Sequence, residues 1–216
     1  TRRSSDLAQH LMANPVVSAI YEGLWRPTFT RIFSLGGPGT AEYDKAFTAY
    51  LARTGERQIL DVACGPGLYT RRLAQHLTGD GRAIGLDFSP AMLARAVHKP
   101  HDRTTFIRGD AHHLPFPDDT FDTVACFAAL YLIPDPLPVI DELVRVTRPG
   151  GEIAIFTSVQ TAVSRIPGVQ LVGRMTGYHF FGDDEITERL RQAGVSRIEQ
   201  TIVDQGQFVL AHKDHS

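Results

Sequence analysis

The sequence of 216 residues is long enough for one domain with a substantial core, and its hydrophobic fraction of 43% and charged fraction of 21% are ordinary for a globular protein. The formal net charge of −2 and the scattered arginines argue against nucleic acid as a partner. Two cysteines, Cys64 and Cys126, exclude a disulfide framework and lie in no metal-spaced cluster, so we expect buried, reduced thiols and no metal site. The absence of a signal peptide and of a membrane-spanning apolar run favours a cytoplasmic protein.

Residues 1–55 are predicted to form an N-terminal helical lid that precedes a core unit at residues 56–216. An apolar stripe with two large aromatic side chains comprises Val17, Ile20, Tyr21, Leu24 and Trp25. Two interpretations stay open: the stripe packs its aromatic side on the core, as such stripes usually do, or it faces a ligand pocket. In the second case, Tyr21 and Trp25 are candidate substrate-binding residues.

The stretch Ile59-Leu-Asp-Val-Ala-Cys-Gly-Pro-Gly67 predicts the first strand, a tight turn and a helix of a nucleotide-binding α/β domain. The strand is expected to run from Gln58 to Val62, and apolar residues recur at helical spacing after the turn. Gly65 and Gly67 lack the Cβ atoms that would keep a ligand away from the backbone. The following helix offers its N-terminal N–H groups to a ligand in the crevice.

Strands and helices then alternate, which indicates a mostly parallel sheet with helices on both faces. The expected strands are 82–87, 104–108, 121–127 and 152–157, the last one entered through a sharp turn at 149–151. One helix is expected to start at Ser89-Pro90, with Ser89 as its N-cap, and another at Pro136. The buried face of the first helix is expected to comprise Met92, Leu93, Ala96 and Val97.

After the strand at 152–157 the periodicity is lost, and residues 159–182 are interpreted as a variable segment on the substrate side. Asp183 is expected to cap a further helix, which Gly194 ends. Residues 196–203 and 207–211 predict an antiparallel hairpin that closes the sheet.

Three successive strands carry an acid at or just beyond the carboxyl end, namely Asp61, Asp87 and Asp110. Ligands of an open parallel sheet bind outside these ends. Asp87 suits the two hydroxyls of a ribose, Asp110 an exocyclic amine such as that of adenine, and Asp61 either turn N–H groups or a cationic group. One such Asp usually caps a turn, but three in order favour a ligand role for at least one. This ring of negative charge favours an adenosine with a cationic tail over a pyrophosphate.

Five motifs occur in order at ordinary spacings: Leu60-Asp-Val-Ala-Cys-Gly-Pro-Gly67, Gly85-Leu-Asp-Phe-Ser-Pro-Ala-Met-Leu93, Gly109-Asp-Ala111, Leu114-Pro-Phe-Pro-Asp-Asp-Thr-Phe-Asp122 and Val144-Arg-Val-Thr-Arg-Pro-Gly-Gly151. Together they resemble class I S-adenosylmethionine-dependent methyltransferases, most closely those of the ubiquinone- and menaquinone-biosynthesis type. The resemblance implies a doubly wound, Rossmann-like sheet of seven strands in the order 3-2-1-4-5-7-6, with the last strand antiparallel. It also implies S-adenosyl-L-methionine as the cofactor and S-adenosyl-L-homocysteine as its product.

The same resemblance implies the contacts of the cofactor. Its methionine portion would be met by the first acid and the turn, namely Asp61, Ala63, Cys64, Gly65 and Gly67. Asp87 would take the ribose hydroxyls, while Phe88 and Met92 would flank the adenine. Asp110 would meet the adenine amino group, Ala111 would donate a backbone N–H, and Phe127 would lie near the reacting sulfur.

Residues 128–134 lack the motif of enzymes that methylate nucleobase or amide nitrogens, which argues against DNA or protein amides as substrates. Methyl transfer from a sulfonium mainly requires alignment and exclusion of water, so the catalytic residue stays unassigned, with His179 and Tyr131 as candidates. Tyr131, Tyr178 and His179 are also candidate substrate-binding residues, and a packing or capping role is the alternative for His179. His112 and His113 are expected to be solvated loop residues.

Aromatic and aliphatic residues in the lid and the variable segment favour a small, fairly apolar methyl acceptor, such as a natural product or a quinone-like ring. An NAD-dependent oxidoreductase is rejected because no third glycine follows Gly67 and because the aspartates suit a pyrophosphate poorly. A second alternative stays open: the fold binds the cofactor without methyl transfer, as a partner subunit or as a template for a cyclisation. The sequence carries no signal for the methylated atom type or for the oligomeric state.

Overall fold

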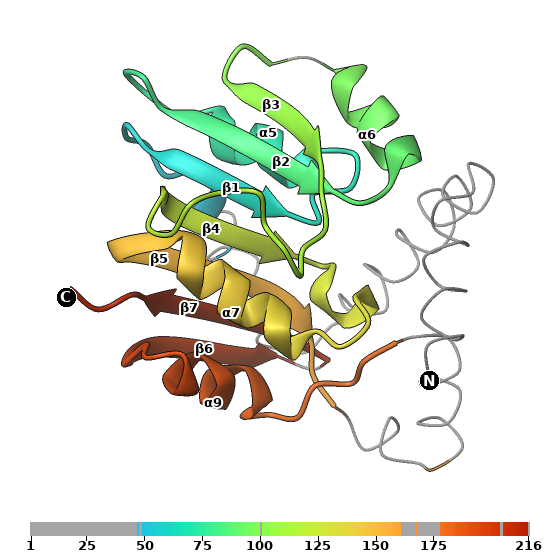
Figure 1. Cartoon of the computed structure of the whole chain (residues 1–216), viewed down its shortest axis with the longest axis vertical. Helices are drawn as coiled ribbons and strands as arrows, with labels where there is room; N and C mark the ends of the chain where they lie inside the picture. The colour runs from blue at the N-terminus through green and yellow to red at the C-terminus, as the bar shows by residue number, and fades with distance from the viewer. Residues whose placement is uncertain are drawn as a thin grey trace.

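The computed structural model describes residues 47, 49–99, 101–160, 167, 178–203 and 205–215. Within these residues, seven strands form one sheet in the order β3-β2-β1-β4-β5-β7-β6 (Figure 1). The parallel part comprises β1 (Gln58–Val62), β2 (Arg82–Asp87), β3 (Thr104–Arg108), β4 (Phe121–Phe127) and β5 (Thr147–Ser158). The last two strands, β6 (Arg197–Val203) and β7 (Gly206–His212), form an antiparallel hairpin, and β7 pairs antiparallel with β5. The strand order and the reversed strand are therefore confirmed.

The strand order reverses at β1, which pairs with β2 on one side and with β4 on the other. At this point Asp61 lies opposite Gly85 of β2 and opposite Ala125 of β4. A crevice outside the carboxyl ends of the strands is expected at such a reversal, because the helices that follow the two neighbouring strands run to opposite faces of the sheet.

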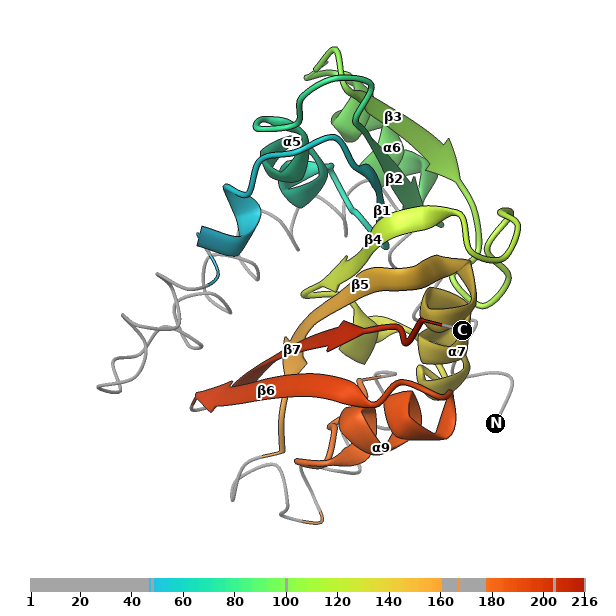
Figure 2. The same cartoon turned by 90° about the vertical axis from the view of Figure 1, so that its left-hand side faces the viewer.

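Helices cover both faces of the sheet, as the alternation of elements predicts. Figure 2 shows α5 (Leu68–Ala74) on one side, and α7 (Leu137–Val146) and α9 (Glu185–Gln192) on the other. A further helix, α6 (Pro90–Val97), packs against β2 and β3. No helix within the described ranges combines the length and apolar character needed to cross a bilayer.

Two apolar clusters lie on the two faces because successive strand residues point in opposite directions. In β4, Val124 and Cys126 belong to the cluster that includes α7 and α9, whereas Ala125 and Phe127 belong to the cluster that includes α5. Central strands buried on both faces read as continuous apolar runs rather than as an alternation. The expectation of buried, reduced cysteines is confirmed, since Cys64 and Cys126 are both free and buried.

Three local expectations are corrected. Val97 does not belong to the buried face of α6, since it is 56% exposed, whereas Met92 and Ala96 are buried. The N-cap of α9 is Asp184 rather than Asp183, and its side chain makes no capping hydrogen bond. The turn at 149–151 is an irregularity inside β5, in which Gly150 takes a left-handed backbone conformation (φ 72°).

The connection from β3 to β4 is a loop attached to α7. Arg145 of α7 donates to the carbonyl oxygens of Leu114 (3.0 Å) and Phe116 (2.9 Å). Glu142, one turn earlier in the same helix, accepts the backbone N–H of Leu114 at 2.7 Å and pairs with Arg145. This loop also carries Asp110, so α7 fixes the backbone that follows the third strand-end acid.

Candidate functional site at the carboxyl ends of the strands

The turn after β1 is built from residues with left-handed backbone conformation. Ala63 (φ 56°), Gly65 (φ 55°) and Gly67 (φ 73°) all have positive φ, and the turn is closed by a 3.0 Å hydrogen bond from the Gly67 N–H to the Cys64 carbonyl. Gly67 then forms the N-cap of α5. Positive φ costs a residue with a Cβ free energy, so the strain at Ala63 shows that the surrounding structure enforces this turn.

The two glycines of the turn leave different surroundings. A Cβ on Gly67 would lie 2.5 Å from the ring of Phe106, so this glycine makes room for a side chain of β3. Among the described residues, nothing lies within 4 Å of a Cβ placed on Gly65. The open space beside the backbone, which the sequence suggested for both glycines, is therefore found at Gly65.

Asp87, at the end of β2, is the acid that holds the turn. Its Oδ2 accepts the backbone N–H of Gly65 at 2.7 Å, and its Oδ1 accepts the backbone N–H of Ser89 at 2.8 Å. Burial raises the pKa of Asp87, and these two hydrogen bonds act against the rise. Each carboxylate oxygen has a second lone pair, so the group can still accept from two ligand hydroxyls.

Asp61 makes a different contact from the turn N–H groups considered for it. Its buried carboxylate accepts a hydrogen bond from the Thr70 hydroxyl of α5 at 2.5 Å. Burial raises the pKa of Asp61 to about 7; the Thr70 hydrogen bond opposes this effect, and the nearby charge of Asp87 adds to it. A buried carboxylate with such a pKa is well suited to face a cationic group, which would stabilise its ionised form. The sequence offered no signal for Thr70 as its partner.

Asp110, beyond the end of β3, has a side chain that is 50% exposed and paired with His112. His112 was expected to be solvated, and this expectation is wrong: its side chain is 22% exposed, and both ring nitrogens have partners. His113 is solvated as expected, with a side chain that is 88% exposed. The sequence could not distinguish the two adjacent histidines, because the partners of His112 include carbonyl groups of a distant loop.

The remaining predicted cofactor residues differ in exposure. Phe88 is 44% exposed beside the guanidinium of Arg108, whereas Met92 and Ala111 are buried. Phe127 is buried in an aromatic group, with ring-centroid distances of 5.2 Å to Phe47 and 5.4 Å to Tyr69. In the part of the chain that is described, no three His, Cys, Asp or Glu side chains gather so that they could hold a metal ion.

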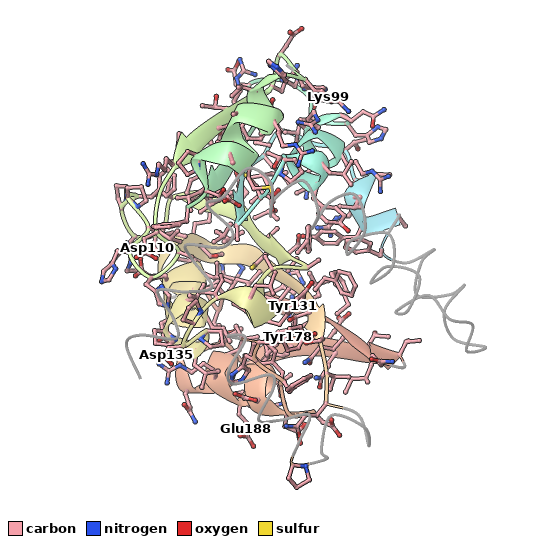
Figure 3. The ribbon with its side chains drawn as sticks, turned by 90° about the vertical axis from the view of Figure 1, so that its right-hand side faces the viewer. Lys99, Asp110, Tyr131, Asp135, Tyr178 and Glu188 are labelled. Carbon is pink, nitrogen blue, oxygen red and sulfur yellow. The ribbon has the colours of Figure 1, made fainter. Side chains whose placement is uncertain are left out.

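An aromatic group lies beyond β4, in the predicted acceptor region. Tyr131, in the short 3-10 helix η2 (Leu130–Leu132), has its ring centroid 4.9 Å from that of Tyr178, and the two lie side by side in Figure 3. Phe180 extends the group, with a centroid distance of 4.7 Å to Tyr178. The structure thus brings Tyr131 and Tyr178 together, while Tyr21 and Trp25 lie outside the described residues.

His179 connects this aromatic group to α9. Its backbone N–H donates to the Tyr131 carbonyl at 2.8 Å, and its Nε2 lies 2.8 Å from Oε1 of Glu185. The other oxygen of Glu185 accepts the backbone N–H of Gly182 at 2.9 Å. Glu185, which sequence reasoning missed, therefore fixes His179 at the start of α9. These contacts are those expected of a capping and packing residue, and among the described residues Nδ1 of the ring has no hydrogen-bond partner.

Comparison with known proteins gives this geometry a family context. A model of the family described as "Methyltransferase domain" matches residues 60–155, which include the glycine turn and all three strand-end acids. An uncharacterized chloroplastic methyltransferase of Arabidopsis thaliana is 31% identical over 212 residues, which cover 92% of this chain and 58% of that protein. A demethylmenaquinone methyltransferase of Lysinibacillus sphaericus is 41% identical over 119 residues, which cover 54% of this chain and 50% of that protein.

The chain is thus similar in sequence to proteins named as methyltransferases, among them demethylmenaquinone methyltransferases. It spans about half the length of the curated relatives that it matches. Phosphoethanolamine N-methyltransferase 2 of Haemonchus contortus, solved in complex with S-adenosyl-L-methionine, superposes with a TM-score of 0.77 at 18% identity, covering 98% of this chain and 60% of that chain. This likeness shows that the class I methyltransferase fold is shared.

Proposed function

We propose that this methyltransferase relative binds S-adenosyl-L-methionine and transfers its methyl group to a small, fairly apolar acceptor. One observation carries the proposal: carboxylates lie at or just beyond the carboxyl ends of three neighbouring parallel strands, β1, β2 and β3. They surround a turn in which no described residue approaches a Cβ placed on Gly65. Such a ring of negative charge suits a ligand that joins a nucleoside to a cationic tail. When bound, the cofactor would supply an activated methyl group.

The residues around the turn fit this cofactor in three respects. Asp61 is a buried acid that a cationic group would hold in its ionised form. Asp87 keeps lone pairs for the ribose hydroxyls while it holds the turn. Phe88 presents an exposed ring next to Asp87, which suits one face of an adenine.

The acceptor is proposed to bind against the aromatic group of Tyr131, Tyr178 and Phe180. The three rings are tilted against one another, and Tyr178 and Phe180 are half-buried while Tyr131 is buried. They offer apolar aromatic contact area, which favours an aromatic or quinone-like acceptor over a strongly charged one. The demethylmenaquinone methyltransferases among the relatives support this choice. His179, whose Nε2 is paired with Glu185, is the candidate base for an acceptor that must lose a proton.

The test is calorimetric titration of the full chain with S-adenosylmethionine, S-adenosylhomocysteine and NAD. We expect binding of the two sulfur ligands and none of NAD. Asp87→Ala should weaken that binding by on the order of 1–3 kcal/mol, because the ribose hydroxyls lose their acceptor. Asp80→Ala is the matched control, because it removes an exposed carboxylate before the other end of β2 and should leave affinity unchanged.

The possible results separate the two parts of the proposal. If the wild-type chain binds neither sulfur ligand, the cofactor assignment is overturned. If Asp87→Ala folds with an unchanged circular dichroism spectrum and binds as tightly as the wild type, the ribose is placed wrongly. Binding without formation of S-adenosylhomocysteine from any aromatic or lipophilic acceptor would favour the alternative of a cofactor-binding protein without methyl transfer.

A further inference from the structure

His112 joins two loops at the cofactor side of the sheet. Its Nδ1 lies 3.0 Å from Oδ1 of Asp110, and its backbone N–H donates to the same oxygen at 2.9 Å. Its Nε2 lies 2.9 Å from the carbonyl oxygen of Pro134 and 3.1 Å from that of Asp135, in the loop between β4 and α7. Figure 3 shows Asp110 and Asp135 on the same flank of the molecule.

The partners of His112 determine which form of its ring fits. A neutral imidazole has one N–H donor and one bare nitrogen, whereas an imidazolium donates from both nitrogens. Here one nitrogen faces a carboxylate and the other faces two carbonyl oxygens, all of which only accept hydrogen bonds. A neutral ring would therefore place a lone pair against an acceptor on one side or the other, and only the cation satisfies both sides.

The charged groups around His112 favour the same form. Burial lowers the pKa of His112, but the hydrogen bonds to Asp110 and to the carbonyls of Asp135 and Pro134 outweigh burial, so the pKa is raised. Burial raises the pKa of Asp110, but its hydrogen bonds with His112 and the nearby His112 and His113 rings lower it overall. Of the other titratable groups in the described residues, Glu142 of α7 is acted on by the charge of His113, and Asp135, whose backbone carbonyl contacts His112, has an exposed side chain.

We infer that the His112 imidazolium is a positioning residue for the adenine of the cofactor, because it fixes Asp110 so that one carboxylate oxygen is presented to the adenine amino group. The inference rests on the proposed function. Oδ1 of Asp110 is taken by the backbone and the ring of His112. Within the described part of the chain, the other oxygen, Oδ2, has only the His113 ring at 3.9 Å, which is beyond hydrogen-bond distance, so it is left to accept from a ligand.

The loop carbonyls make this arrangement rigid. Without a second anchor, a half-exposed aspartate beyond a strand end can adopt several side-chain rotamers, and ordering one of them costs free energy on binding. Nε2 of His112 ties the Asp110 pair to the backbone of residues 134 and 135, where Asp135 has a left-handed conformation (φ 49°). The carboxylate is thereby oriented before the ligand arrives.

The experiment compares two ligands that differ only at the position that Asp110 would contact. S-Adenosylhomocysteine carries the 6-amino group, and its 6-deamino analogue carries a hydrogen atom on carbon there, which does not donate, while N1 of the ring stays an acceptor in both. The ratio of their dissociation constants, measured by calorimetry on the full chain from about pH 6 to about pH 8, reports on this contact. Titration of Asp61 in the same range cancels in the ratio, because that acid would face the part common to both ligands.

For the wild type at about pH 6, we expect the adenine ligand to bind about tenfold more tightly than the 6-deamino ligand. The ratio should fall as the pH rises, because a deprotonated His112 ring can no longer donate both to Asp110 and to the loop carbonyls. His112→Gln should show a ratio about fivefold lower at about pH 6, with little pH dependence, and Asp110→Asn should bring it near unity. His113→Gln, the exposed neighbour, is the control and should keep the wild-type ratio and its pH dependence.

The outcomes are distinguishable. A wild-type ratio that does not fall with rising pH overturns the inference without using any variant, so the test survives if a variant fails to fold. A wild-type ratio in His112→Gln at about pH 6 also overturns it. If the wild type binds both ligands equally well, Asp110 does not contact the 6-amino group and the inference is overturned. If it binds neither ligand, the proposed function is overturned as well.

Discussion

At the scale of single residues, the turn after β1 separates two uses of glycine. Gly65 and Gly67 both have left-handed conformations, but among the described residues only Gly67 is packed against another side chain, the ring of Phe106. Sequence spacing alone treats the two glycines as equivalent. The distinction comes from β3, whose side chain fills the space beside the second glycine and leaves the space beside the first open.

This difference predicts that an alanine at Gly65 mainly weakens ligand binding, whereas an alanine at Gly67 mainly lowers stability. Gly65→Ala should lower the free energy of unfolding by only about 1 kcal/mol, the cost of a Cβ at positive φ, yet weaken binding of S-adenosylhomocysteine by at least about tenfold. Gly67→Ala should cost on the order of 2–4 kcal/mol of stability, because the Cβ also displaces Phe106. Denaturant unfolding and calorimetry measure both quantities; a Gly65→Ala protein with unchanged affinity would contradict the assignment of the open space.

The buried Asp61 carboxylate is expected to lower the stability of the folded chain and to strengthen binding of a cationic ligand. Because the pKa of Asp61 is raised to about 7 in the folded chain, ionisation of this side chain places a charge in the interior. The free energy of unfolding should therefore fall between about pH 4, the pKa of an aspartate in the unfolded chain, and about pH 7, and then level off. Asp61→Asn removes this cost. At about pH 8 it should stabilise the protein by on the order of 1–3 kcal/mol, while binding of S-adenosylmethionine becomes weaker because its cationic end loses a carboxylate.

Thermal or urea unfolding as a function of pH checks this prediction, with Asp80→Asn as a control that removes an exposed carboxylate. The control should change stability by less than about 0.5 kcal/mol at each pH. A destabilised Asp61→Asn protein at about pH 8 would show that the Thr70 hydrogen bond outweighs the cost of burying the charge.

At the scale of elements, the loop between β3 and β4 owes its position to α7. Arg145 donates to Leu114 and Phe116, and it also pairs with Glu142 and with Asp118 at 2.7 Å. The loop partners of Arg145 lie in the motif that begins at Leu114. A motif identified by its turn residues and prolines is therefore held in position by a helix that lies outside the motif.

Arg145→Ala should therefore destabilise the protein by about 1.5–3 kcal/mol, because two loop carbonyls and the Glu142 carboxylate lose a charged donor. Arg148→Ala is the matched control: its partner is Asp122, at 2.5 Å, and its side chain is mainly exposed, so its loss should cost no more than about 1 kcal/mol. Urea unfolding of the two variants gives the comparison. Equal costs would mean that the Arg145 contacts add nothing beyond a surface ion pair.

At the scale of the whole molecule, the fold follows from local patterns to a large extent. The bounds of β1, β2, β3 and β4 agree with the apolar runs and the turn residues around them. The Pro149-Gly150-Gly151 segment shows where local patterns fail. Its backbone pairs with Lys213 at the far end of the chain, and this long-range pairing keeps a sequence typical of a turn inside β5.

The site could be predicted less completely, for a similar reason. The sequence placed the three acids at strand ends, and the strands support that placement. Which acid holds the turn, and which histidine is anchored, depend on groups that the fold brings together: Gly65 with Asp87, and His112 with Pro134. Periodicity carries no information about such pairs.

The position of β7 has a consequence for synthesis of the chain. Although β7 follows β6 in the sequence, it lies between β5 and β6 in the sheet. As the chain leaves the ribosome, β6 has no strand to pair with, and the edge of β5 stays uncovered until Gly206–His212 has been made. An uncovered edge is a template for pairing with other chains. A nascent chain stalled before β7 should therefore be the form most prone to aggregation, with the parallel strands already in place.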